Sequence, residues 1–339
     1  MTARSYLTTL AITCLLLAGC GDKTTKAPSS PAASPSEPAS AASSSATPVT
    51  LPAITTLDAA QKFTDNNSPD WILTSHAVAW VATTEGVRRY SPDGTILGTT
   101  SVGGPICLAM DEGFEAVWVG VCGPEAAIVR LDPATGEVTA RISVGGGLMP
   151  EGSLGAGEGA VWAITGDPVR LLRIDPATNA VSGSFTLGAG AAGVRAGEGG
   201  VWVTLADVGK VARINPATGE IVEAIAVGST PRFLTVANGG VWVMNNGDGS
   251  VSHIDPATDH VVATISVDAG PINGGDIAAG GGSVWARVSN SVVARIDPKG
   301  DTVTARYGSP SGSGSVGADD GAVWISAHDV NTIWRLPLK

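Results

Sequence analysis

Seven tryptophans recur along this chain at nearly constant spacing, and this regularity constrains the fold more than any other feature of the sequence. They are Trp80, Trp118, Trp162, Trp202, Trp242, Trp285 and Trp324. The intervals between them are 38, 44, 40, 40, 43 and 39 residues. A second motif, Arg-Ile-Asp-Pro-Ala-Thr-Gly with variants, keeps the same phase and begins at residues 89, 130, 173, 213, 253 and 295. Two motifs locked together in this way indicate tandem structural repeats.

Each repeat contains four short runs that are typical of β-strands. In the fifth repeat they are Pro231–Ala237, Gly240–Met244, Ser250–Asp255 and Val261–Val267, with Gly, Asn or Asp between them as tight hairpins require. The second run has consecutive apolar residues around Trp242, so we expect both of its faces to be buried. Four strands in about 40 residues are typical of a propeller blade. The sequence therefore predicts an all-β, seven-bladed β-propeller.

The two ends of the repeat region predict how the ring closes. After Trp324 the chain offers one more strand, Thr332–Leu336, before it reaches Lys339. The segment Ile54–Thr64 precedes the first innermost strand. We expect this N-terminal segment to supply the fourth strand of the last blade, because an open ring would leave unpaired strand edges.

The Asp-Pro-Ala-Thr-Gly motif has a backbone explanation. Proline sets the φ angle of a type I turn, the preceding Asp or Asn accepts amide hydrogen bonds, and glycine supplies a positive φ. The motif therefore predicts the hairpin between the third and fourth strands. A basic residue precedes each turn, and we expect these residues to form ion pairs between blades, with an anion-binding ring as the alternative. They are Arg89, Arg130, Arg173, Arg213, Arg295 and Arg335, with His253 in the fifth repeat, and the expected partners include Glu112, Glu158, Glu198 and Asp320.

The N-terminal region is predicted to be an export signal followed by a tether. Residues 1–20 contain a short apolar stretch that ends in Leu-Ala-Gly-Cys20, which resembles the lipobox of bacterial lipoproteins. Lipidation of Cys20 would place the protein outside the cytoplasm, anchored to the bacterial cell membrane; the alternative is an ordinary signal with a chance cysteine. Residues 21–52 are rich in Ser, Ala, Pro and Thr and are expected to be disordered. The propeller would then span residues 53–339.

Two cysteines, Cys107 and Cys122, remain in the predicted mature domain. They flank a predicted hairpin whose turn is Asp111 to Glu115, so they could face each other across two antiparallel strands. In an oxidising compartment this arrangement favours a disulfide. The alternative is two buried thiols on opposite faces.

Composition and motifs exclude several classes of function. The formal net charge is −11 and no run of Lys and Arg is present, which argues against a nucleic-acid partner. Common hydrolase, zinc and phosphate-binding motifs are absent. Asp65, Asn67 and Asp70 have calcium-like spacing, but Asp70 stands where an EF-hand loop needs glycine. We therefore assign no metal and no cofactor, and we expect a monomer that contacts the membrane only through its lipid.

The Val-Trp-Val and Arg-Ile-Asp-Pro-Ala-Thr-Gly phrases resemble those of seven-bladed propellers of the YVTN-repeat (YncE-like) family. The repeat style is also similar to that of virginiamycin B lyases and NHL-repeat proteins. In the lyases, catalytic histidines follow the prolines that open innermost strands. The corresponding residues here contain no histidine, which argues against lyase activity. They are Asp70, Ile106, Glu151, Arg232 and Ile272.

Candidate binding residues lie on the face that carries the fourth-to-first and second-to-third loops, which we call the upper face. They are Asp70, Glu151, Arg232, Asn273, Asp276, Asp248 and His328. We expect a small polar or cationic ligand, or a protein partner, at the upper mouth of the central channel, in a binding or scaffolding module. The alternatives are ordinary solvated loops, and an enzyme that acts on a small polar substrate.

Overall fold

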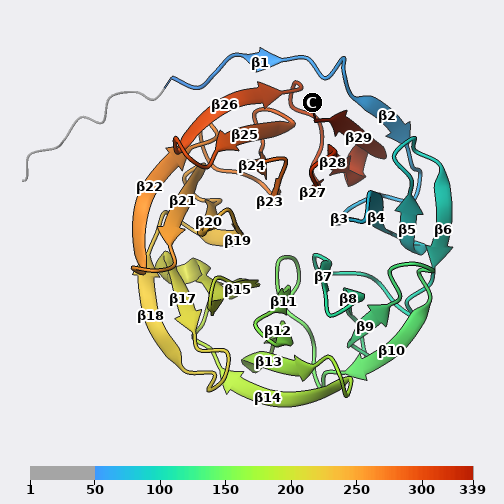
Figure 1. Ribbon diagram of the computed structural model, residues 1–339, viewed down its shortest axis with the longest axis vertical. Helices are drawn as coiled ribbons and strands as arrows, with labels where there is room; N and C mark the ends of the chain where they lie inside the picture. Colours follow the sequence, from blue (N-terminus) through green and yellow to red (C-terminus); the bar gives the residue numbers. More distant parts are fainter. Residues whose placement is uncertain (1–49, 339) are drawn as a thin grey trace, which may run out of the picture. The chain divides into compact units, whose positions relative to one another are not determined.

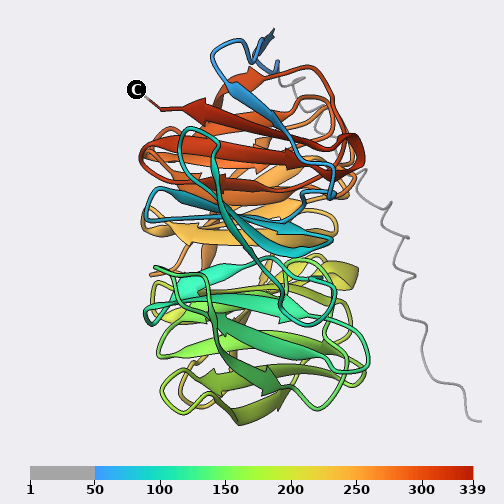
Figure 2. The same cartoon turned by 90° about the vertical axis from the view of Figure 1, so that its right-hand side faces the viewer.

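The computed structural model describes residues 50–338, which form seven β-sheets around a central axis (Figure 1). Each sheet is a blade whose first strand lies nearest the axis and whose fourth lies at the circumference. Viewed from the side, the strands run along the thickness of the disc (Figure 2). This architecture confirms the predicted all-β, seven-bladed propeller. The predicted signal, Cys20 and almost all of the predicted tether lie outside the described residues.

The strands of the blades follow one another in chain order. Blades one to three contain β3 (Ile72–Ser75), β4 (Val78–Thr83), β5 (Gly86–Tyr90) and β6 (Ile96–Thr100); β7 (Asp111–Gly113), β8 (Ala116–Val121), β9 (Ala127–Leu131) and β10 (Val138–Ser143); and β11 (Leu154–Gly157), β12 (Ala160–Gly166), β13 (Val169–Asp175) and β14 (Ala180–Thr186). Blades four and five contain β15 (Ala191–Gly197), β16 (Gly200–Leu205), β17 (Lys210–Ile214) and β18 (Ile221–Ala226); and β19 (Pro231–Ala237), β20 (Gly240–Asn245), β21 (Ser250–Asp255) and β22 (His260–Ser266).

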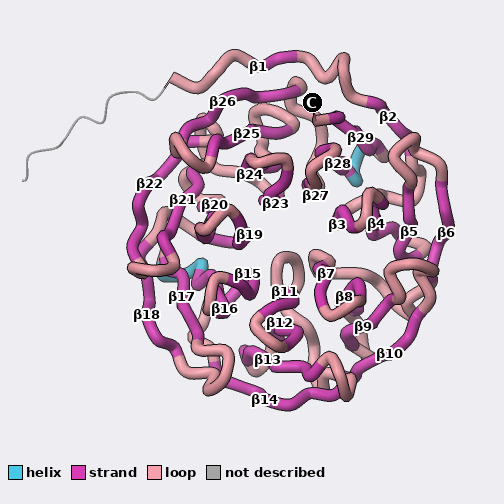
Figure 3. Tube along the Cα trace, viewed as in Figure 1, coloured by secondary structure: helices cyan, strands magenta, loops and turns pink. Residues whose placement is uncertain are grey.

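Blades six and seven use the same order but also recruit the N-terminal segment. They contain β23 (Asp276–Gly280), β24 (Ser283–Arg287), β25 (Val293–Asp297), β26 (Thr302–Tyr307) and β1 (Ile54–Thr55); and β27 (Val316–Ala318), β28 (Ala322–Ala327), β29 (Thr332–Pro337) and β2 (Gln61–Thr64). Two short 3-10 helices, η1 (Ala206–Val208) and η2 (His328–Val330), stand between second and third strands (Figure 3). Within residues 50–338, no helix has the length and apolar character needed to cross a bilayer.

The recurring tryptophan fixes the second strand of every blade between its neighbours. All seven are at most 1% exposed. In blades two to six the indole N–H donates to a carbonyl five residues earlier, at the end of the first strand, with N···O distances of 2.9–3.2 Å. Burial of a large apolar ring with its polar atom satisfied explains why this residue type recurs.

The basic residues ahead of the turns lie across the strand from the tryptophans. Trp202, for example, is the register partner of Arg213, whose guanidinium carbon lies 5.2 Å from the indole centroid. Similar cation–π contacts occur in blades one, two, six and seven at 5.4–5.9 Å. In blade five the imidazole of His253 stacks on Trp242 at 3.9 Å.

The prediction of which acids pair with these basic residues is wrong. Arg213 pairs with Asp259 at 2.8 Å, and His253 Nδ1 lies 2.7 Å from Asp301 Oδ1. Both acids belong to the third-to-fourth turn of the next blade, whereas Glu112 lies in β7 and Glu158 in the turn between β11 and β12. Glu112 instead lies 3.3 Å from His76, and Glu158 accepts the Gly199 N–H at 3.0 Å.

The ring closes through β2, as predicted, but the N-terminal segment is divided in two. β2 pairs antiparallel with β29, with Gln61 opposite Arg335 and Thr64 opposite Thr332. β1 instead pairs in parallel with β26 of blade six, where Ile54 lies opposite Arg306. The segment predicted as one strand therefore spans two blades and bends between them, with the Ala60 N–H donating to the Leu57 carbonyl at 2.8 Å.

Candidate functional site

A cavity of 180 Å³ opens on the upper face, at the mouth of the central channel. Its walls come from the segments that enter the innermost strands and from the loop between β28 and β29. Its lining residues are Asp70, Trp71, Ile106, Cys107, Glu151, Phe233, Gly274, Gly275, Ser313, Gly314 and His328. A neighbouring cavity of 290 Å³ shares Asp70, Ile106 and His328 with it. We call the 180 Å³ cavity the mouth.

Four of the predicted site residues meet at this mouth as two pairs of side chains. His328 Nδ1 lies 3.4 Å from Asp70 Oδ1, which joins blade seven to the entry of blade one. Arg232 Nη2 donates to Glu151 Oε2, which joins blades five and three across the channel. All four side chains are 37–41% exposed, so they remain accessible to a ligand. Burial raises the pKa of the Asp70 carboxyl, and the nearby His328 partly offsets this rise.

Two aromatic residues that sequence reasoning missed also line the mouth. Trp71 and Phe233 are 7% and 2% exposed, and their ring centroids are 6.0 Å apart. Each directly follows a predicted site residue, Asp70 or Arg232, and the Arg232 guanidinium carbon lies 6.0 Å from the Phe233 ring. Their position beside charged residues at the strand entry was the available signal.

The backbone of Glu151 is held in an unusual conformation. Its φ is 80°, in the left-handed region that residues other than glycine rarely occupy. Its N–H donates to the Cys107 carbonyl at 2.7 Å, and its carbonyl accepts the Ala109 N–H at 2.8 Å. Such a conformation costs about 1–3 kcal/mol and persists only where surrounding bonds enforce it. The segment through Cys107 therefore positions the Glu151 carboxylate.

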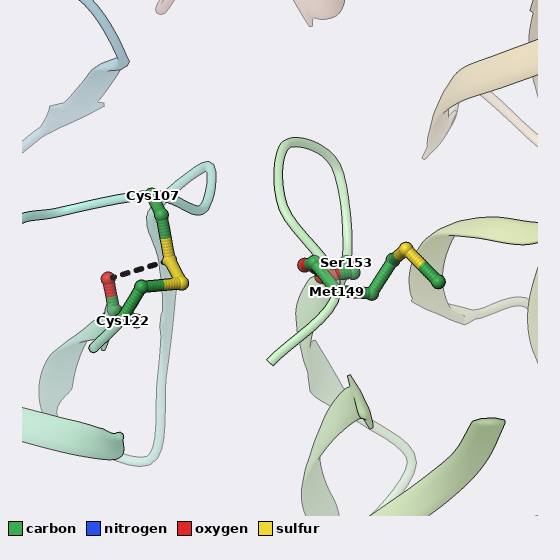
Figure 4. The surroundings of a disulfide bond; sticks show 5 residues. Cys107, Cys122, Met149 and Ser153 are labelled. Atoms are coloured by element: carbon green, nitrogen blue, oxygen red, sulfur yellow. Dashed lines mark hydrogen bonds between the residues drawn. A yellow bond between two sulfur atoms is a disulfide. The ribbon is translucent and has the colours of Figure 1, made fainter. Parts of the chain in front are cut away.

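That segment is fastened by a disulfide between Cys107 and Cys122, whose Cα atoms are 5.8 Å apart (Figure 4). The Cys107 N–H donates to Gly120 at 3.2 Å, and the Cys122 N–H donates to Pro105 at 2.9 Å. The two cysteines thus face each other on paired antiparallel segments, and the arrangement on opposite faces does not occur. The disulfide lies at the mouth itself, since Cys107 is one of its lining residues.

A further cavity of 170 Å³ lies along the innermost strands and is lined by Asp111, Arg195 and Asp276 among others. We call it the channel cavity. Asp276 is 5% exposed and accepts the Ser315 hydroxyl at 2.6 Å and the Ile277 N–H at 2.8 Å. Burial raises its pKa to about 6, while Arg195 and Ser315 act in the opposite direction. Burial also raises the pKa of Asp111, again opposed by Arg195.

Sequence reasoning missed Asp111 and Arg195. Asp111 was read as the start of a hairpin turn, but it opens β7, a short innermost strand. Arg195 lies within β15, where the surrounding small residues gave no sign that its side chain borders the channel. Comparing the innermost strands residue by residue across the repeats would have been the signal.

The remaining two predicted residues do not line the mouth or the channel cavity. Asp248 accepts the Ser229 N–H at 2.7 Å and the Ser250 hydroxyl at 2.6 Å, which makes it a cap for the loop between β20 and β21. The Asn273 N–H donates to the Ser289 hydroxyl at 2.9 Å, and this residue is exposed beside the mouth loops. Both residues stabilise loops of the upper face.

The chemistry of this site is polar and of mixed charge. Residues 50–338 contain no group of three or more His, Cys, Asp or Glu side chains placed to hold a metal ion. The mouth offers two carboxylates, one guanidinium, one imidazole and two aromatic rings. Such a set can pair with both ends of a small charged molecule while its apolar part contacts the rings.

Comparisons with known proteins agree with the fold. No family model matches the chain, and no curated protein matches its sequence. Solved structures that resemble it include U3-55K, with a TM-score of 0.68, 11% identity and coverage of 82% of this chain and 98% of that one. BamB from Moraxella catarrhalis has a TM-score of 0.58 and 11% identity, over 81% of this chain and 98% of that one. Hydrazine synthase of Kuenenia stuttgartiensis has a TM-score of 0.65 and 15% identity, over 80% and 96%. Identities this low establish a shared propeller fold and nothing about function.

Proposed function

We propose that this protein is a binding module whose upper mouth takes a small polar or cationic ligand. The observation that carries the proposal is that the Asp70–His328 and Glu151–Arg232 pairs line one cavity together with Trp71 and Phe233. Four blades contribute these residues to one cavity. Propellers commonly serve as protein-binding or scaffolding modules, and an exposed charged mouth on a rigid ring suits that role.

A thermal-shift screen against small metabolites, with amines and amino acids included, tests this proposal. A ligand that binds the folded state raises Tm by mass action. We expect at least one compound to stabilise the parent protein and to lose that effect in the Asp70→Ala/Arg232→Ala variant. The control is Arg170→Ala/Glu223→Ala, which removes one exposed charge of each sign away from the mouth. Equal shifts in all three proteins would refute the proposed site.

The Asp70–His328 pair favours an enzyme as the second candidate function. A carboxylate beside an imidazole can orient it as a general acid or base. If the site is catalytic, mass spectrometry of the compound found in the screen will show turnover by the parent and none by His328→Gln, with binding retained. Recovery of the intact compound after prolonged incubation with the parent would contradict a catalytic role and support binding only.

We also propose that the propeller is a lipid-anchored, extracytoplasmic protein with a repeat of the YVTN (YncE-like) type. The sequence up to Cys20 and the recurring turn motif support this assignment. In a bacterial host the parent should fractionate with membranes, and Cys20→Ser should move it to the soluble fraction or block its processing. Membrane association unchanged in Cys20→Ser would contradict the anchor.

A further inference from the structure

The turns between third and fourth strands do more than close hairpins, because each also covers the preceding blade. In blade one, Arg89 donates to the Ala134 carbonyl in the turn of blade two at 3.1 Å. In blade two, Arg130 donates to the Pro176 carbonyl in the turn of blade three at 3.0 Å. Arg213 of blade four donates to both the carbonyl of Pro256 and the carboxylate of Asp259. The basic residue of one blade is thus a receptor for the turn of the next.

An aromatic residue occupies the same register position on the outer strand of three blades. Phe63, Phe185 and Tyr307 lie two residues beyond the register partner of the blade's arginine. A Cβ added to Gly94, in the turn of blade one, would collide with the Phe63 ring. A Cβ added to Gly219, in the turn of blade four, would likewise collide with Phe185. The turn backbone therefore packs directly on the aromatic ring.

The seam between blades six and seven has no such turn. The fourth strand of blade seven is β2, which arrives from the other end of the chain, so no hairpin joins β29 to it. A cavity of 380 Å³ lies there instead, bordered by Trp285, Arg295, Tyr307, Asp320 and Leu338. We call it the seam slot. In the other blades the equivalent position is occupied by the next blade's turn.

The polar groups of the seam slot match a peptide backbone. Arg295 lies over Trp285 at 5.4 Å, and its Nε donates to the Ser283 hydroxyl at 2.9 Å. Within residues 50–338, its two terminal nitrogens donate to no protein acceptor. Asp320 borders the same cavity and can accept an N–H. A polypeptide turn supplies both a carbonyl for the arginine and an amide N–H for the aspartate, whereas a simple anion has no donor for Asp320.

We propose that the seam slot binds an acidic type I turn from a partner polypeptide, in the way the other blades bind the turns of their neighbours. The ligand would carry an Asx-Pro-type turn, with a backbone carbonyl and a following carboxylate directed at Arg295. The turn of blade five shows this chemistry, since Pro256 and Asp259 together hold Arg213. This site is separate from the upper mouth and does not depend on its ligand.

Isothermal titration with a cyclic peptide that contains residues 254–261 tests the proposal. We expect saturable binding to the parent and a loss of affinity of about tenfold or more in Arg295→Gln, since charge-assisted hydrogen bonds are the stronger kind. A peptide with Ala in place of Asp259 should bind the parent more weakly, and Arg295→Gln should weaken the binding of this peptide by a smaller factor than that of the Asp259 peptide. Arg170→Gln is the matched control and should bind like the parent.

The proposal is overturned if the parent does not bind the peptide, if Arg295→Gln binds it unchanged, or if acetate at the same concentration displaces it. Tm and circular dichroism of each variant show whether it is folded. If Arg295→Gln is not folded, Tyr307→Ala provides the second test, because the ring should contact the turn backbone as Phe185 contacts Gly219. Unchanged affinity in a folded Tyr307→Ala would also overturn the proposal.

Discussion

At the scale of single residues, two kinds of ionisable side chain in this propeller have different effects on stability. Those of the outer region, such as Arg213, are satisfied by tryptophan faces and by turns of the next blade. Those of the channel cavity, such as Asp276 and Asp111, have their carboxylates held by amides and hydroxyls. The first kind stabilises the ring. Burial of the second kind lowers the stability of the folded state at pH values where the carboxyl group is ionised.

The variant Asp276→Asn tests how burial of this carboxyl group affects stability at different pH values. The pKa of Asp276 in the native state is raised from 3.8 to about 6, so the native protein binds more protons than the unfolded chain between these values. Its contribution to stability therefore falls as pH rises from about 4 to 6, by up to about 3 kcal/mol. Asp276→Asn should raise Tm at pH 7.5 and leave it nearly unchanged at pH 3.5. A lower Tm for the variant at pH 7.5 would contradict this account.

At the scale of elements, β2 decides whether the ring is closed. Its Phe63 stacks on Trp324 of β28, with ring centroids 5.8 Å apart, and packs under the turn of blade one. β2 thus contacts both blades that flank the closure, and its loss would expose the edge of β29.

Phe63→Ala should therefore destabilise the whole propeller. Because the ring is only partly buried, we expect a loss of about 2–4 kcal/mol in chemical denaturation, at the lower end of values for aromatic truncations. Thr64→Ala, at an exposed position of the same strand, is the control and should change little. Equal effects of the two substitutions would contradict the view that packing of Phe63 holds the ring of blades closed.

The Cys107–Cys122 disulfide couples an element to the site. It closes a segment with a sequence separation of 15 residues, for which chain entropy predicts about 3 kcal/mol of stabilisation. Cys107→Ala/Cys122→Ala should lower stability by about this amount. Reductant should destabilise the parent and have no effect on the variant. If the variant keeps the parent's stability, the bond contributes nothing to the fold.

At the scale of the whole molecule, the sequence repeat explains the propeller fold, and the residues that differ between repeats form the candidate sites. The tryptophan period and the turn motif were sufficient to predict seven blades and closure by the N-terminal segment. They could not place Arg195 or Asp111, because the depth of a side chain along the channel depends on where each innermost strand begins. Nor could they show that the Asp248 carboxylate accepts hydrogen bonds from Ser229 and Ser250, because the bond to Ser229 joins two different loops.

The sequence also could not predict which acids meet the ring of basic residues. The third-to-fourth turn of one blade packs against the preceding blade. Arg213 therefore pairs with Asp259, although Glu198 is closer to it in sequence. That offset between blades is a property of the assembled ring. No third-to-fourth turn lies over the seam slot beside Arg295, because blade seven is completed from the other end of the chain.

The most direct test of the central claim, that the upper mouth is the binding site, is a crystal structure of the protein soaked with the compound that shifts its Tm most. The account predicts ligand density in the mouth, in contact with Asp70 or Glu151 and with the rings of Trp71 and Phe233. Ligand density elsewhere on the propeller, with the mouth empty, would contradict it.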